Sequence, residues 1–365
     1  MRIAQVVPLH VAVPPAGYGG TERVAYNLSE ALVKLGHDVT VFASGDSHTS
    51  GRLVPGVDKA INFSTDIDAS AYHIAQLMDV YGRAGEFDVV HSHLDHMTLP
   101  FIEQSKTPTV ITLHGRLDAP ESQRALRMYR QANYISISDS QRRDIPELNW
   151  VATVHHGVDV DSFPFYHEAG DYLCFVGRMS PEKRPDRAIE IAKRAGIPLK
   201  IAAKVDAKEA GYFHSEIEPL LDHPLIHWMG QLGEKDKRKL MGRALALVMP
   251  IDWPEPFGMV FIEALACGTP VLTCPMGSVP ELLVDGVTGC VRCTVDEMAD
   301  AVKELRHISR LGCRRYAERR FDMLRMALEY VNVYSNVQGR RALFAKPAPV
   351  RPDAASDPVE EVAFS

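Results

Sequence analysis

The residues with the clearest potential for chemistry are two glutamates, Glu255 and Glu263, with seven residues between them. Apolar patterning predicts a strand that ends at Pro250 and a helix over 258–267. Glu255 then lies in the loop before the helix, where it can accept hydrogen bonds from ligand hydroxyls. Glu263 lies within the helix and can reach a diol such as a ribose. Backbone N–H groups at the helix start lie between the two acids and are available to a phosphate; they belong to Gly258, Met259 and Val260.

Two basic residues follow another predicted strand, Leu173 to Val176. Arg178 and Lys183 lie in the loop after that strand, and cations there could neutralise a diphosphate. Taken alone, such a loop is more typical of a solvated basic surface. Because the acid pair follows a different strand of the same predicted sheet, the combination favours a binding site.

A glycine-rich segment, Gly17-Tyr-Gly-Gly-Thr-Glu-Arg23, stands between the first predicted strand and the first predicted helix. Its N–H groups, including those of Gly19 and Gly20, could hold a phosphate at the helix start. About nine residues separate it from the strand, and its spacing differs from the dinucleotide fingerprint. We therefore reject a dehydrogenase; an ordinary turn with a helix cap remains the alternative.

These residues must be positioned by alternating strands and helices, the pattern of parallel sheets covered by helices. In the first half, helices are predicted over Val24–Leu35, Ala71–Tyr81 and Glu121–Ala132. The predicted strands of that half are Ile3–Pro8, Val39–Phe42, Val89–His91, Thr109–Leu113 and Tyr134–Ser138. After a linker near 163–170 the alternation restarts, with strands at Leu173–Val176, Leu199–Ala203, Ile226–Met229, Ala246–Pro250 and Val271–Thr273.

The restart predicts two Rossmann-like α/β domains that face a central cleft. The expected divisions are one domain over 1–165, a second domain over 170–320, a C-terminal segment over 321–340 and a mobile tail over 346–365. Open parallel sheets bind ligands beyond the carboxyl ends of their strands. Both domains could therefore direct their loops into one shared site.

Composition sets the broad class. The chain has 365 residues, of which 46% are hydrophobic and 24% charged, typical of a globular protein of two domains. The net charge of −7 argues against a nucleic-acid partner. Six cysteines are too few for a disulfide scaffold and indicate a reducing compartment, so we expect a cytoplasmic protein.

Several other signals are weaker. The uncharged stretches 3–20 and 264–280 are interrupted by proline or glycine, so neither predicts a membrane span. The lone pair Cys290 and Cys293 and the cluster His91, His93 and His96 are poor metal sites, and no metal is predicted. The arginines over 306–320 are interpreted as a solvated helix face. Basic residues over 121–132 (Arg124, Arg127 and Arg130) could meet an anionic membrane as a peripheral contact.

Five motifs together resemble a known family, the retaining nucleotide-sugar glycosyltransferases of the two-Rossmann-domain (GT-B) fold, family 4, which carry an E-x7-E motif. The resemblance covers roughly 1–337. Its motifs are Gly19-Gly-Thr-Glu-Arg23, Thr112-Leu-His-Gly115, His156-Gly-Val-Asp159, Gly177-Arg178 with Lys183, and the segment from Glu255 to Glu263. One departure is Gly277-Ser278, where the family often has paired glycines.

The resemblance implies that the domain over 1–165 binds the acceptor, that the domain over 170–320 binds the nucleotide sugar, and that a C-terminal helix over 321–340 crosses back to the first domain. It also implies roles for the matched residues. Arg178 and Lys183 would bind the donor diphosphate, Glu263 the ribose, and Glu255 the transferred sugar. Gly20 would lie near the phosphates. His114 looks like the histidine that approaches the sugar from the first domain. Arg178, Lys183, Glu255 and His114 are thus the predicted catalytic set, with neither acid acting as a nucleophile.

We therefore expect a hexosyltransferase that moves a sugar from a nucleoside diphosphate to an acceptor hydroxyl with retention, in glycan or glycoconjugate biosynthesis. UDP-glucose is the favoured donor, the acceptor is unidentified, and no metal or other cofactor is expected. Two alternatives stay open. A nucleotide-sugar epimerase of the same fold would need no acceptor, and a non-catalytic nucleotide-sugar binder would release no nucleoside diphosphate.

Overall fold

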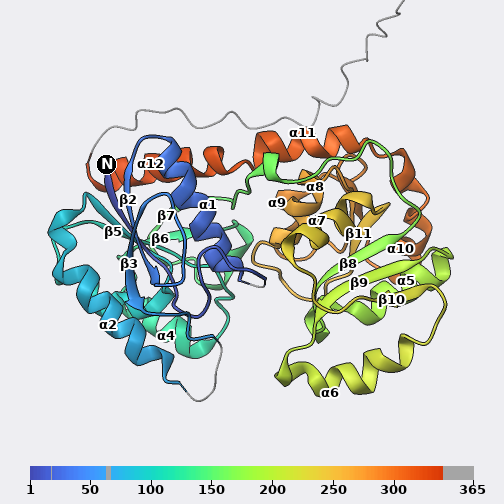
Figure 1. Ribbon diagram of the computed structural model, residues 1–365, viewed down its shortest axis with the longest axis horizontal. Helices are drawn as coiled ribbons and strands as arrows, with labels where there is room; N and C mark the ends of the chain where they lie inside the picture. Colours follow the sequence, from blue (N-terminus) through green and yellow to red (C-terminus); the bar gives the residue numbers. More distant parts are fainter. Residues whose placement is uncertain (18, 63–66, 340–365) are drawn as a thin grey trace, which may run out of the picture.

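The computed structural model describes residues 1–17, 19–62 and 67–339, which form two α/β lobes side by side (Figure 1). The first lobe holds a seven-stranded sheet of order β3-β2-β1-β4-β5-β6-β7, and the second a six-stranded sheet of order β10-β9-β8-β11-β12-β13. Every pairing between these strands is parallel. The predicted fold class is confirmed. The tail predicted over 346–365 lies outside the described residues.

The strands of the first sheet are β1 (Arg2–Val6), β2 (Asp38–Ser44), β3 (Arg52–Val57), β4 (Val89–Ser92), β5 (Thr109–Thr112), β6 (Asn133–Ser136) and β7 (Trp150–Thr153). Those of the second are β8 (Leu173–Arg178), β9 (Leu199–Lys204), β10 (Ile226–Trp228), β11 (Ala246–Met249), β12 (Val271–Thr273) and β13 (Gly289–Val291). All ten predicted strands are present, with bounds within two residues of the prediction. The prediction missed β3, β7 and β13.

The α-helices are α1 (Gly20–Lys34), α2 (Ala69–Gly82), α3 (Leu99–Ile102), α4 (Pro120–Met128), α5 (Pro185–Ala195), α6 (Ala210–Tyr212), α7 (Glu234–Arg243), α8 (Met259–Ala266), α9 (Val279–Leu282), α10 (Val295–Ala301), α11 (Arg310–Arg320) and α12 (Met323–Val337). Helix α1 presents one apolar face to the sheet and ends before Gly36, whose φ of 82° suits the left-handed backbone that closes a helix. Helix α4 is shorter than predicted and ends at Met128.

Strand order locates the edge where ligands bind. In both sheets the chain first builds outward on one side of the first strand and then crosses to its other side, so the order reverses between β1 and β4 and between β8 and β11. Loops on the two sides of such a reversal diverge and leave a crevice at the carboxyl ends of the strands. Arg178 and Lys183 follow β8 and Glu255 follows β11, so sheet topology alone places them beside this point.

The last helix connects the two lobes. Helix α11 covers the second lobe, whereas α12 lies on the first lobe beside α1 (Figure 1). Tyr330 and Tyr334 of α12 are fully buried in the core of the first lobe with Leu28 and Leu32 of α1. Burial of such a side chain contributes on the order of 2 to 3 kcal/mol, so this segment is an integral part of a lobe made mostly of residues before 160.

The arginines over 306–320 correct a prediction. They do not form one helix, because a short 3₁₀ turn at Glu304–His307 precedes α11. They are also not all solvated. Arg310 is 7% exposed, and its guanidinium donates to the backbone oxygens of Tyr166, Gly242 and Ala244. Arg314 likewise donates to two backbone oxygens. These carbonyls come from segments distant in sequence, so a helical charge pattern cannot reveal them.

Candidate functional site

Lys183 and Glu255 meet at the reversal point of the second sheet. The Lys183 ammonium is hydrogen-bonded to Oε2 of Glu255, and only 15% and 10% of the two side chains are exposed. The indole N–H of Trp253 donates to the same oxygen at 3.1 Å. The ammonium also lies 4.7 Å from the centre of the Trp253 ring, within cation–π range. Tertiary structure thus holds a cation and a carboxylate in contact across 72 residues of sequence.

Arg178 lies at the start of the loop that carries Lys183. It is the last residue of β8, and its guanidinium donates to Oε1 of Glu182 at 2.7 Å. A backbone bond from Asp252 N–H to the Glu182 oxygen, 3.0 Å long, joins the loop after β8 to the loop after β11. Burial raises the pKa of Glu182, but hydrogen bonds from its own backbone N–H and from the Ser180 side chain, together with the charges of Arg178 and Lys183, hold it below its usual value. The two predicted cations therefore share one electrostatic environment.

The loop that carries Glu255 is supported by two glycines. Gly258 is the N-cap of α8 with a φ of 82°, and no side chain caps the helix, so its first N–H groups keep their positive potential. Gly277 has a φ of 60°, and a Cβ there would lie 2.3 Å from the Glu255 backbone nitrogen. The next residue, Ser278, donates from its N–H to the Glu255 carbonyl at 2.9 Å. The departure from paired glycines thus falls at a turn that supports the Glu255 loop.

Glu263 lies about 7.5 Å further along the axis of α8 than Gly258, at ~1.5 Å per residue. Its carboxylate is 3.1 Å from the ammonium of Lys237 on α7. Lys237 also reaches Glu234 at 2.8 Å, and Glu234 pairs with Arg23 of α1 at 3.1 Å. The two acids raise the pKa of Lys237, while burial opposes that shift. A line of alternating charges therefore runs from Glu263 to the first lobe.

Sequence reasoning missed Lys237 and Glu234. They stand in a run of charged residues at the start of α7, Glu234-Lys-Asp-Lys-Arg238, which is typical of a solvated helix. No local signal separates Lys237 from its neighbours. Only the packing of α7 against α8 brings its ammonium to Glu263.

The predicted glycines of the first lobe lie at the start of α1. Gly19 is the N-cap, and a Cβ there would lie 2.8 Å from the Cβ of Pro15. Gly20 has no atom within 4 Å of its would-be Cβ, so a ligand could approach the backbone closely at this position. Burial raises the pKa of the neighbouring Glu22 to about 7.

His114 follows β5 in the first lobe. Its ring stacks on His156 with centroids 5.2 Å apart, and His156 lies 4.7 Å from the ring of Phe257 in the loop before α8. Burial lowers the pKa of His114 to about 3. The ring is therefore neutral at physiological pH, so it can donate or accept a hydrogen bond but adds no charge.

Direct contacts join the lobes around this site. The Ser138 hydroxyl donates to the carbonyl of Pro256 at 2.7 Å. Glu281 of the second lobe accepts from the backbone N–H groups of Asp139 and Ser140 at 2.7 and 2.8 Å, and lies 3.1 Å from Nε2 of His155. Arg178, Lys183 and Glu255 therefore gather beside the first lobe, with the 258–260 helix start adjoining them. Glu263 lies deeper, against Lys237.

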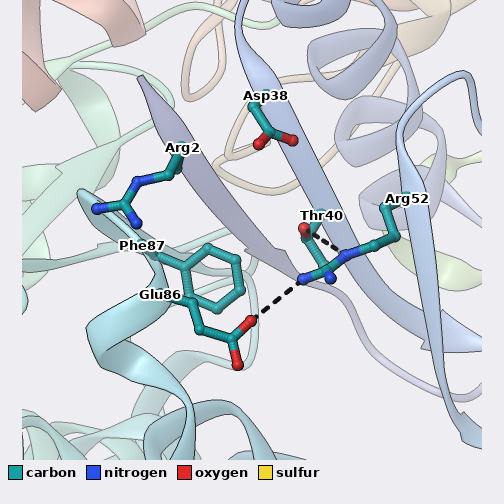
Figure 2. A pocket seen from close by; sticks show the side chains of 6 residues that line it. All are labelled: Arg2, Asp38, Thr40, Arg52, Glu86 and Phe87. Atoms are coloured by element: carbon teal, nitrogen blue, oxygen red, sulfur yellow. Dashed lines mark hydrogen bonds and ion pairs between the residues drawn. The ribbon is translucent and has the colours of Figure 1, made fainter.

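A pocket of about 230 Å³ lies elsewhere (Figure 2). Arg2, Asp38 and Arg52 in its wall are the first residues of β1, β2 and β3, so it lies at the amino ends of the strands, opposite the edge that binds ligands. Figure 2 shows the Arg52 guanidinium bonded to Thr40 and Glu86. Because it lies at the edge of the sheet opposite the ligand-binding crevice, we do not assign the pocket to the donor.

The structure also bears on the weaker sequence signals, namely the cysteine pair, the metal sites and the membrane spans. Cys290 is fully buried on β13, whereas Cys293 is exposed beyond the strand, so the two cysteines lie in different environments. Within the described parts of the chain, no three His, Cys, Asp or Glu side chains gather as metal ligands would. None of the helices described there is long and apolar enough to cross a membrane.

Comparison with family models decides the identity. Residues 18–162 match the model Glycosyltransferase Family 4, and residues 164–320 match Glycosyl transferases group 1, so the two matches adjoin and follow the two lobes. This chain belongs to glycosyltransferase family 4. It is a nucleotide-sugar-dependent glycosyltransferase of the GT-B fold, as the five motifs predicted.

Similar proteins differ in the reactions for which they are named. This family 4 glycosyltransferase is 26% identical to the glycogen synthase of Mycobacterium tuberculosis, over 81% of its own chain and 83% of the relative. It is also 26% identical to the phosphatidyl-myo-inositol mannosyltransferase of Mycolicibacterium smegmatis, over 93% and 95%. The crystal structure of Anabaena Alr3699/HepE in complex with UDP-glucose matches with a TM-score of 0.70 at 17% identity, over 92% of this chain and 100% of that one.

Proposed function

We propose that this glycosyltransferase moves a hexose from a UDP-sugar, with UDP-glucose the favoured donor, to an acceptor hydroxyl with retained anomeric configuration. The observation that carries the proposal is the gathering of Arg178, Lys183 and Glu255 beside the uncapped start of α8. Such a set matches the parts of a nucleotide sugar: cations for a diphosphate and a carboxylate for sugar hydroxyls. The UDP-glucose complex of a protein with this fold supports the choice of donor.

The donor-free site is electrostatically balanced. Lys183 is held by Glu255 and Lys237 by Glu263, so each proposed carboxylate already has a cation against it. We propose that the donor exchanges these contacts: the diphosphate takes Arg178 and Lys183, which releases Glu255 to the sugar hydroxyls. In the same way, the ribose diol binds Glu263. Gly19 and Gly20 would let the phosphates approach the start of α1.

In the proposed reaction the bond between the anomeric carbon and the diphosphate oxygen breaks, and the acceptor oxygen bonds to that carbon on the same face. The acceptor proton passes to an oxygen of the departing phosphate. Negative charge grows on the diphosphate, so cations fixed in advance lower the barrier. Arg178, Lys183 and the N–H groups of Met259 and Val260 supply that potential. His114, neutral and facing the second lobe through His156 and Phe257, would orient the sugar.

The acceptor belongs to the first lobe in this proposal. One observation favours an acceptor presented at a membrane: Met128, at the end of α4, is 75% exposed beside the exposed Arg124 and Arg130. An apolar side chain among cations can enter an anionic lipid surface. Sedimentation with anionic and with neutral phospholipid vesicles tests this peripheral contact. A membrane contact predicts binding to the anionic vesicles alone, reduced in the Met128→Ser variant.

A screen of nucleotide sugars tests the proposed donor. Each sugar, and each free nucleoside diphosphate, is added at saturating concentration while the melting temperature is followed. A ligand present at about 100 times its dissociation constant stabilises by about 2.7 kcal/mol. Slow release of UDP from the bound sugar without acceptor marks a transferase. Interconversion of the donor sugar without UDP release would favour the epimerase alternative, and tight binding without turnover would favour the non-catalytic binder.

A further inference from the structure

Hydrogen bonds run unbroken from His114, at the surface of the first lobe, into the core of that lobe. Nε2 of His114 lies 2.8 Å from Nδ1 of His93, and Nε2 of His93 lies 2.9 Å from Oε1 of Gln5. The Gln5 amide N–H donates to the hydroxyl of Tyr334 at 3.2 Å. Gln5 of β1, His93 just after β4, His114 just after β5 and Tyr334 of α12 therefore contribute to one connected line.

The line continues beyond Tyr334. Its hydroxyl lies 2.7 Å from Nδ1 of His91, and Nε2 of His91 lies 2.8 Å from the Thr112 hydroxyl. Thr112 in turn lies 3.0 Å from the hydroxyl of Tyr330. His93 is 2% exposed and the other members inside the lobe are fully buried, so water does not compete for these bonds. His114, partly exposed, is the member that reaches the lobe surface.

The Gln5 amide points its NH₂ group at Tyr334 and its oxygen at His93, and this orientation sets the direction of the bonds between Tyr334 and His114. A glutamine NH₂ group can only donate and its carbonyl can only accept. Tyr334 therefore accepts from Gln5 and gives its own proton to Nδ1 of His91. The Gln5 carbonyl must receive the Nε2 proton of His93, which leaves Nδ1 of His93 as an acceptor. His114 must then be the donor to His93, through a proton on Nε2.

Neutral rings are required throughout this line, and the surroundings favour them. Burial lowers the pKa of His91 and His93 well below the usual value. The groups that face them or His114 are mostly uncharged: the stacked ring of His156 and the phenols of Tyr330 and Tyr334. Asp95 lies against the backbone N–H of His114, and burial raises the pKa of this carboxyl to about 7. Arg325 of α12 faces His156 and disfavours a second cation there.

We infer that Gln5, His93 and Tyr334 are positioning residues that hold His114 as the neutral tautomer with its proton on Nε2. The inference rests on the proposed role of His114 toward the sugar. This tautomer leaves Nδ1 of His114 unprotonated, so that it can accept a hydrogen bond from a ligand hydroxyl. It also explains His91 and His93 without a metal, because both nitrogens of each ring are occupied by hydrogen bonds. The C-terminal helix thereby reaches the site through a single hydroxyl.

The first test measures the tautomer in the donor-free, full-length protein. Histidine is labelled with ¹⁵N, and long-range proton–nitrogen correlation distinguishes a protonated Nε2 from a protonated Nδ1. The His114 signal is the one missing from the His114→Gln variant. We expect a neutral Nε2–H ring from about pH 6 to about pH 8, the range in which an unperturbed histidine titrates. A proton on Nδ1, or a charged ring in that range, would overturn the inference.

The second test removes the link from α12. Tyr334→Phe deletes the hydroxyl that orients Gln5, and we expect a mixed His114 tautomer with kcat about fivefold lower at unchanged donor KM, the effect of one lost hydrogen bond. Tyr81→Phe is the matched control, because the buried Tyr81 hydroxyl bonds Thr109 at 2.9 Å outside the line. If Tyr334→Phe keeps the wild-type tautomer and kcat, the inference is wrong. A retained Nε2–H tautomer in a protein that transfers no sugar would instead count against the proposed function alone.

Discussion

Removal of Lys183 should separate its effect on stability from its effect on catalysis, because its partner in the donor-free protein is Glu255. In Lys183→Ala the Glu255 carboxylate, 10% exposed, keeps the Trp253 N–H but loses its cation. A surface ion pair contributes below ~1 kcal/mol, and loss of one partner of a fully buried pair costs ~3 to 5 kcal/mol. For this partly solvated pair we expect about 2 kcal/mol, or a melting temperature lowered by about 4 to 8 °C in a lobe of ~150 residues.

The catalytic effect should be larger. Loss of a group that stabilises charge in the transition state typically costs ~3 to 4 kcal/mol, equivalent to a hundredfold to a thousandfold in turnover. Because the carboxylate is the source of the instability, the double variant Lys183→Ala, Glu255→Gln should recover most of the lost stability. It should recover none of the lost turnover, since the missing cation cannot be replaced by an amide.

The assay is a double-mutant cycle with the wild type, both single variants and the double variant, each measured by denaturant unfolding and by steady-state transfer at saturating donor. Arg194→Ala is a suitable control, because it removes a half-exposed arginine of α5 whose ion-pair partners, Glu190 and Asp296, are not site residues. The reasoning is refuted if Lys183→Ala turns over like the wild type, or if the double variant regains activity together with stability.

Three further outcomes are expected. Glu263→Gln should weaken the binding of free nucleoside diphosphate by about tenfold, because a charged hydrogen bond is lost; calorimetry measures this affinity. Glu255→Gln should leave the affinity unchanged and lower the transfer rate. The reverse pattern would exchange the two assignments. Transfer should persist in EDTA, because Arg178, Lys183 and the start of α8 supply the positive potential, and activity restored only by magnesium or manganese would contradict this. The unfolding free energy should fall as pH falls below about 6.5. Burial depresses the pKa of five histidines, His73, His91, His93, His114 and His156, so the unfolded chain binds protons that the folded chain does not. An unfolding free energy that stays constant down to pH 5 would show that these rings are not held neutral.

Much of the fold could be predicted from the sequence because its signals are local. Runs of β-branched residues mark buried parallel strands, and the restart after residue 170 marks a second sheet. Of the strands that the prediction missed, β3 contains Pro55 and Gly56 and β13 begins with Gly289, residues that weaken a strand pattern. The spacing of Glu255 and Glu263 around a helix start was also readable, since helix geometry depends on neighbours within a few residues.

The contacts of the site residues depended on tertiary structure. Nothing near Lys183 in the sequence indicates that its ammonium meets Glu255, and nothing near Glu263 indicates Lys237. Such pairs form where strand order brings separate loops to one edge, and strand order is decided by packing across the whole lobe. The line from Tyr334 to His114 is the extreme case, because Gln5 and Tyr334 are 329 residues apart and meet only after α12 has crossed back to the first lobe. The residue types that could perform chemistry were predictable from the sequence. Their partners and protonation states are decided by the packing of the folded core.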